Sequence, residues 1–101
     1  MKLILLTLVF MLLVFTNSRA DEGEVIYKTV CSKCHNINPT KPGSIGPELF
    51  TTPKEVFKTK VITGTYPVSY KPKRKTRIMP RFKNLTNKID SIYNYIRSFK
   101  K

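Results

Sequence analysis

The sequence predicts a small all-α domain of three to four helices, and three observations lead to this prediction. Apolar residues recur at helical spacing in three segments, residues 21–31, 52–63 and 86–99. The chain shows no alternation of strand and helix patterns and no internal repeat. The two connections, residues 36–50 and 64–82, are interrupted by proline and glycine, which favour loops over helices or central strands.

Residues 1–20 have the pattern of a cleavable signal peptide. Lys2 precedes an apolar run from Leu3 to Phe15, and a small-x-small site follows at residues 18–20. The run is shorter than the roughly 20 residues that a membrane-spanning helix needs, so an uncleaved anchor is the weaker alternative. We expect cleavage after Ala20, export of the protein, and a single mature domain at residues 21–101.

The first predicted helix begins next to Asp21. Acidic residues there, Asp21, Glu22 and Glu24, place negative charge where the first turn of a helix is stabilised by it. Apolar side chains at Val25 or Ile26, Tyr27 and Val30 then form a helical stripe. This stripe leads directly into Cys31.

The second predicted helix is marked by signals at both ends. Thr52 and Glu55 form a capping box around Pro53, a residue favoured at the first helical position. The helix is expected to run to about Thr63, with Gly64 as its stop. Its expected inner face consists of Val56, Phe57, Val61 and, at the edge, Lys60.

The last predicted helix has the clearest apolar periodicity. Thr86 is the expected N-cap, and Asp90 lies near the first turn. One face carries Ile89, Ile92, Ile96 and Phe99, and Lys100 and Lys101 lie at the C-terminal end. The long loop that precedes this helix, residues 64–82, is unusual unless it wraps a bound group or has a function of its own.

The sequence Cys31-Ser32-Lys33-Cys34-His35 is the arrangement used for covalent attachment of a c-type haem. The two sulfurs form thioether bonds, and the histidine is the proximal ligand of the iron. A zinc site normally uses four Cys or His ligands, and the chain holds no other Cys or His. Two further interpretations of the cysteine pair are less favoured: a thioredoxin-like redox pair and a structural disulfide between Cys31 and Cys34.

Met79 is the candidate for the second iron ligand. It is the one methionine outside the predicted signal peptide, and it lies in the long loop. A methionine more often fills a gap in a core than binds a metal. In a small chain that also carries a haem motif, the ligand role is favoured, because a thioether stabilises ferrous iron and suits an electron carrier. A lysine or water is the competing sixth ligand.

With these residues in place, the chain resembles the class I (mono-haem) cytochromes c, in particular the short bacterial periplasmic type. The matching residues are Gly23 and Tyr27 before the haem motif, Ile92 and Tyr95 on the last helix, Gly46-Pro47-x-Leu49, and Met79-Pro80-x-Phe82. The resemblance implies a small cytochrome c fold around one covalently bound haem c, with a long loop that carries the methionine ligand.

The resemblance also implies roles for single residues. The Pro47 carbonyl would accept a hydrogen bond from the His35 ring and fix its orientation. The chain departs from the family in having no tryptophan, so a haem propionate would need another partner, with Tyr66, Tyr70 and Arg77 as candidates.

Basic residues dominate the second half of the chain. The formal net charge is +13, and no acidic residue lies between Glu55 and Asp90. We expect a basic surface that docks an acidic redox partner, either a dehydrogenase donor or an oxidase acceptor. Its candidate residues are Lys71, Lys73, Arg74, Lys75, Arg77, Arg81 and Lys83. Solubility alone is the simpler explanation for any single lysine.

Other partners of a basic chain are less favoured or open. Nucleic acid is disfavoured because the predicted signal peptide exports the protein away from it. Peripheral association with an anionic membrane stays open.

These patterns and the resemblance imply a monomeric, periplasmic single-electron carrier that is not an enzyme. Two alternatives are open: a haem-based enzyme or gas sensor with a free sixth coordination position, and a dedicated cytochrome subunit of a larger oxidoreductase. No distal histidine or other clear acid–base group is present to support catalysis.

Overall fold

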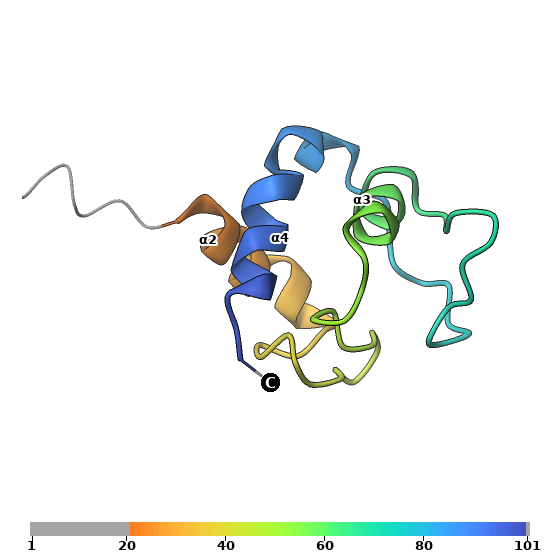
Figure 1. Ribbon diagram of the computed structural model, residues 1–101, viewed down its shortest axis with the longest axis horizontal. Coiled ribbons are helices and arrows are strands. Elements are labelled where there is room, and N and C mark those ends of the chain that lie inside the picture. The colour runs from red at the N-terminus through yellow and green to blue at the C-terminus, as the bar shows by residue number, and fades with distance from the viewer. Residues whose placement is uncertain (1–20, 101) are drawn as a thin grey trace, which may run out of the picture.

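Residues 21–100, the part of the chain that the computed structural model describes, form three α-helices and two short 3₁₀ helices without any strand (Figure 1). The elements in chain order are α2 (Glu22–Thr29), η1 (Cys31–Lys33), α3 (Lys54–Thr63), η2 (Lys83–Lys88) and α4 (Ile89–Arg97). The all-α prediction is therefore confirmed. The predicted signal peptide lies outside the described residues. Within them, no helix has the length and apolar character needed to cross a bilayer.

The closest helix packing joins α2 to α4. Asp21 caps α2 by accepting a hydrogen bond from the Gly23 amide (3.2 Å). At Gly23 a β-carbon would lie 1.9 Å from the Ser91 carbonyl oxygen, so only glycine permits this approach of the two backbones. One turn later the rings of Tyr27 and Tyr95 pack at 5.6 Å between centroids. The expected crossing of the first and last helices is present.

Helix α3 starts at Lys54, one position later than predicted, and ends at Thr63 as predicted. Its N-cap is Pro53, whose extended backbone (φ −61°, ψ 148°) precedes Lys54, and Thr52 makes no cap hydrogen bond. The capping-box prediction is therefore wrong. The stop is correct, because Gly64 adopts the left-handed conformation (φ 77°) that glycine tolerates. The inner face is also correct, since Val56, Phe57 and Val61 are buried.

Helix α4 begins three residues after its predicted cap. Thr86 lies inside η2, where its hydroxyl donates to the Lys83 carbonyl (2.6 Å) instead of capping α4. The turn is wound as a 3₁₀ helix up to Lys88, and α4 starts at Ile89. Of the predicted apolar face, the three isoleucines are buried, and Phe99 lies past the helix end against Tyr95.

One apolar cluster holds these elements together. It consists of Tyr27, Leu49, Phe57, Val61, Ile89, Ile92 and Ile96, with Met79 and Phe82 packed against it. Residues 36–50 and 64–82 contain no helix or strand, as the prolines and glycines predict. Figure 1 shows residues 64–82 on the opposite side of α3 from α2 and α4.

Candidate cofactor site

A cavity lies between α3 and the two loops, residues 36–50 and 64–82. Its empty volume is about 1070 Å³, a value that includes the space at its opening to solvent. The walls are mainly apolar, with Leu49, Val56, Phe57, Val61, Phe82, Leu85 and Ile92 among the lining side chains. Cys31, Cys34, His35 and Met79 line the same cavity. The structure thus brings together all four side chains that the sequence selects for a haem.

The two cysteines lie on the turn that follows α2. Val30 ends α2, and the amides of Cys34 and His35 both donate to the Cys31 carbonyl (3.2 and 3.0 Å). This tight turn places both thiols and the imidazole on one wall of the cavity. Both cysteines are unpaired and half-buried.

The chemistry of Cys31 disfavours a redox role for the free pair. Burial raises the pKa of the Cys31 thiol to about 11, so the thiol stays protonated at neutral pH. Nucleophilic cysteines of disulfide oxidoreductases have a lowered pKa instead. Within residues 21–100, no group of three or more His, Cys, Asp or Glu side chains is arranged to hold a metal ion.

His35 is buried and fixed by one hydrogen bond. Its Nδ1 lies 2.7 Å from the Pro47 carbonyl oxygen, the contact that the family resemblance implies. A carbonyl oxygen only accepts, so Nδ1 carries the proton and Nε2 presents a lone pair. Burial lowers the pKa of His35 against the opposing effect of the Pro47 hydrogen bond, and the Arg74 charge lowers it further. The imidazole is therefore neutral, which is the state that binds a metal.

Two glycines allow residues 43–47 to pass close beneath His35. At Gly46 a β-carbon would lie 2.3 Å from His35 Cε1, and at Gly43 it would lie 2.2 Å from the Cys34 carbonyl oxygen. That same oxygen accepts the amides of Ile45 (3.2 Å) and Gly46 (2.9 Å). The backbone therefore forms a close-fitting support for the imidazole.

Met79 reaches the cavity from the other loop. Its side chain is half-buried and packs against the apolar cluster. Three residues later the Phe82 amide donates to the Val61 carbonyl (2.6 Å), which fixes the end of this loop to α3. Met79 and His35 thus line one cavity, Met79 from the long loop and His35 from the turn after α2.

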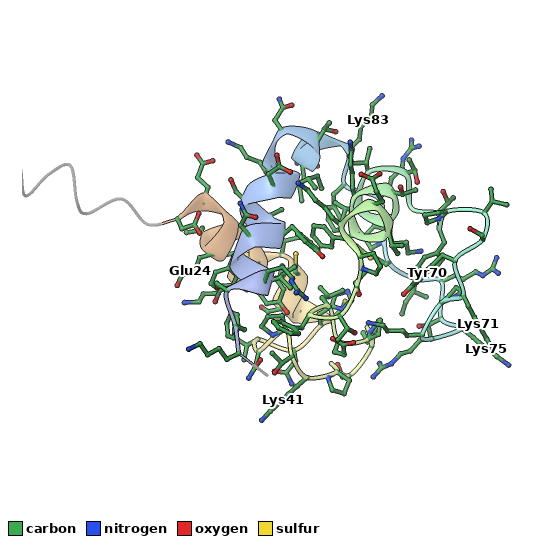
Figure 2. All side chains as sticks on the ribbon, in the orientation of Figure 1. Glu24, Lys41, Tyr70, Lys71, Lys75 and Lys83 are labelled. Carbon is green, nitrogen blue, oxygen red and sulfur yellow. The ribbon has the colours of Figure 1, made fainter. Side chains whose placement is uncertain are left out.

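The basic residues predicted to dock a partner fall into two groups. Lys73 and Arg74 make intramolecular contacts, Lys73 with Glu48 (2.6 Å) and Arg74 with the Gly43 carbonyl (2.9 Å). The remaining five, Lys71, Lys75, Arg77, Arg81 and Lys83, are exposed. Figure 2 shows Lys71 and Lys75 together at the outer edge of the long loop, and Lys83 well apart from them.

The candidate propionate partners also divide. Tyr66 and Tyr70 line the cavity with their rings 5.6 Å apart, whereas Arg77 is not among the lining residues. Lys60, expected only at the edge of the α3 inner face, lines the cavity as well. Its ammonium lies 4.4 Å from the Tyr66 ring centroid and donates to the Gly64 carbonyl (3.0 Å).

Sequence reasoning missed Glu48 and Gly43. Glu48 is the one acidic residue between Glu24 and Glu55, and this isolation in a basic chain was the available signal. Nothing in the local pattern of Gly43 distinguished it from an ordinary loop glycine.

Comparisons of the chain with protein-family models, curated proteins and solved structures found no match.

Proposed function

We propose that this protein is a single-electron carrier with one haem c, attached through Cys31 and Cys34 and ligated by His35 and Met79. One observation carries the proposal: these four side chains, three from the turn after α2 and Met79 from a loop 44 positions beyond His35, line a single apolar cavity.

The donor set and the walls of the cavity suit this group. His35 offers a neutral nitrogen and Met79 a thioether, the ligand pair that raises the reduction potential of a haem iron. The walls of the cavity are mainly apolar, as the surface around a porphyrin ring requires, and the few polar groups lie among them at defined positions. The Cys31 thiol is protonated at neutral pH, which disfavours it as a redox nucleophile, and both cysteines are unpaired and so available for thioether bonds.

Each residue has a separate task in this proposal. The haem, when bound, supplies an iron that alternates between its ferrous and ferric states. Pro47 and Gly46 hold the imidazole in one orientation, so that His35 keeps its position during electron transfer. Phe57, Val61 and their apolar neighbours exclude water from the site, which limits the reorganisation that follows a change of charge.

The proposal extends to the place of action and the partners. The predicted signal peptide directs the chain to the periplasm, where it would exchange electrons, as a monomer, with acidic partners such as a dehydrogenase and an oxidase. Such electron-transfer complexes are small and depend on electrostatic steering. Lys71 and Lys75, which make no ion pair within the described residues, are the best-placed steering charges.

Absorption spectroscopy combined with a redox titration tests this function. We expect a low-spin haem, reversible one-electron reduction, and in the ferric state the weak far-red band given by methionine sulfur bound to iron. Met79→Ala is expected to abolish this sulfur–iron band. A high-spin spectrum and rapid binding of carbon monoxide by the wild type would instead support an enzyme or gas sensor, and constant co-purification with a larger oxidoreductase would support a dedicated subunit.

The predicted steering is tested separately by kinetics. The rate of reaction with an acidic partner should fall as ionic strength rises past about 0.1 M, where the screening length is about 10 Å. Lys71→Met and Lys75→Met should each weaken this salt dependence and change stability by less than about 0.5 kcal/mol. A rate that does not respond to salt contradicts the steering role.

A further inference from the structure

The segment that carries Met79 has few fixed points. It has no helix or strand between Gly64 and Phe82 and contains three prolines. Within residues 21–100, every hydrogen bond from residues 67–81 to other parts of the chain is donated by Lys73 or Arg74. These two side chains therefore fix the middle of a long irregular segment.

Lys73 is held by a dense set of acceptors. Its ammonium lies 2.6 Å from the Glu48 carboxylate, 2.8 Å from the Thr51 hydroxyl, and 3.2 Å from both the Glu48 carbonyl and the Thr52 hydroxyl. The pair is partly shielded, with the Lys73 side chain 30 % exposed and that of Glu48 21 % exposed. An ion pair with this shielding and this many hydrogen bonds is stronger than an ordinary surface pair.

The anchor on the other side of this contact is rigid. Thr52 is buried, and its carbonyl accepts the hydroxyl of Tyr93 from α4 (2.8 Å). Tyr93 in turn packs on Phe57 of α3, with 5.6 Å between the ring centroids. Lys73 is thus connected to the packed helices through Thr52.

Arg74 adds a second point one residue later. Its guanidinium donates to the Gly43 carbonyl (2.9 Å), and Gly43 packs directly against the backbone of Cys34 and His35. The two contacts join the segment that carries Met79 to the loop that supports His35.

We propose that Lys73 and Arg74 are positioning residues that hold the Met79 segment over the cavity, so that Met79 stays bound to the iron. This inference rests on the proposed function and adds to it, because it removes two cations from the predicted docking surface and gives them an internal task. The charge of Glu48 persists at every physiological pH. Burial alone would raise the pKa of this carboxyl, but hydrogen bonds from Lys73 and Thr51 hold it at about 2.

The chain offers a matched control. Lys71→Met and Lys73→Met each remove one positive charge from the same segment, two positions apart, but only Lys73 contacts Glu48. The measurement is the affinity of the ferric protein for added imidazole, which competes with Met79 for the iron. This affinity rises in proportion to the fraction of molecules in which Met79 is released.

We expect Lys73→Met to bind imidazole about tenfold more tightly than the wild type. A tenfold change corresponds to a loss of about 1.4 kcal/mol in the free energy that keeps the segment in place. Arg74→Met should show a smaller increase in the same direction, and Lys71→Met should stay within about twofold of the wild type. Glu48→Gln should behave as Lys73→Met does, and Lys73→Arg should restore most of the wild-type behaviour. The sulfur–iron band of Lys73→Met should also disappear at a lower temperature.

Equal imidazole affinities in the wild type, Lys73→Met and Lys71→Met would overturn the positioning role of Lys73. The proposed electron-carrier function would be unaffected by that result. A wild type without haem or without the sulfur–iron band would instead overturn the proposed function itself. If Lys73→Met does not fold, Glu48→Gln decides, because it removes the charge of the pair and keeps the shape of the side chain.

Discussion

The α2–α4 crossing and the segment that carries Met79 are held in place by different physical means. At the crossing, Gly23 brings two backbones into contact, and buried residues such as Tyr27, Ile92 and Ile96 fill the space on both sides. In residues 64–82 the side chains are mostly exposed, and Val68 is fully so. Apolar packing thus defines one region, whereas a few charged contacts define the other.

This difference assigns separate tasks to the two regions. The crossing fixes the end of α2 and therefore the turn that carries Cys31, Cys34 and His35. The segment supplies Met79 and has no core of its own, so its path depends on the contacts of Lys73 and Arg74 and, in the proposed function, on the haem that it would cover. We therefore expect substitutions at the crossing to act on global stability and substitutions at the segment to act on the iron ligand.

The largest effect is expected when covalent attachment is removed. If the proposed haem fills the cavity, Cys31→Ala/Cys34→Ala removes it, and a domain of this size has too small a core to stay folded without such a group. Most of the helical signal in far-UV circular dichroism should disappear. Native helix content in this double variant would show that the apolar cluster keeps the domain folded without a bound haem.

Gly23→Ala is the next largest change and acts on the crossing alone. A β-carbon 1.9 Å from the Ser91 carbonyl oxygen forces α2 away from α4. The free energy of unfolding, measured with urea, should fall by about 3 kcal/mol, and the sulfur–iron band should persist in the molecules that remain folded. Val25→Ala, on the exposed face of the same helix, is the control and should cost about 0.5 kcal/mol. Equal costs for the two variants would contradict the role of the close approach.

Gly46→Ala tests the support of the imidazole. The added methyl group would lie within 2.7 Å of three ring atoms of His35, so either the ring or residues 43–47 must move. We expect a loss of about 2 kcal/mol in unfolding free energy and a shifted reduction potential. Ser44→Ala, an exposed position of the same loop, should change neither quantity. An unchanged potential in Gly46→Ala would mean that the ring orientation does not depend on this contact.

The smallest of these effects is the pH dependence of the segment. The pKa of Glu48 is about 2 in the folded protein and near 4.5 in the unfolded chain. Because the folded value is the lower one, the stabilisation is complete above pH 4.5 and is lost as the pH falls towards 2. After allowance for solvent screening it amounts to about 1 kcal/mol.

Urea unfolding of the wild type and Glu48→Gln across this pH range measures that contribution. The stability difference between the two proteins should shrink steadily from pH 5 to pH 2, because the wild-type carboxyl becomes protonated. A constant difference over the range would show that the Glu48 charge does not stabilise the fold.

The sequence predicts more of the helical region than of the long segment. Gly64 and the apolar spacing of Val56, Phe57 and Val61 depend on neighbours in the same helix, so local patterns locate α3 well. The two caps failed because distant contacts or turn geometry decided them. Thr52 faces Lys73, and Thr86 belongs to a 3₁₀ turn.

The candidate site divides in the same way. Cys31, Cys34 and His35 form a local motif that is visible without any structure. Met79 was selected as the one methionine outside the predicted signal peptide, and Pro47 came from the family resemblance. The contact of Lys73 with Glu48 joins residues 25 positions apart in two irregular segments, where no periodicity constrains the partners. Charge alone predicted a basic surface and did not separate Lys73 and Arg74, which contact other parts of the chain, from the cations that do not.

Intact-mass spectrometry under denaturing conditions tests the central claim most directly. The protein should be purified after export from cells that carry a cytochrome c maturation system. We predict a mass equal to residues 21–101 plus one haem, because thioether bonds at Cys31 and Cys34 survive unfolding. A colourless protein would contradict the account. So would a mass equal to residues 21–101 without haem in a protein whose two cysteines are both unmodified.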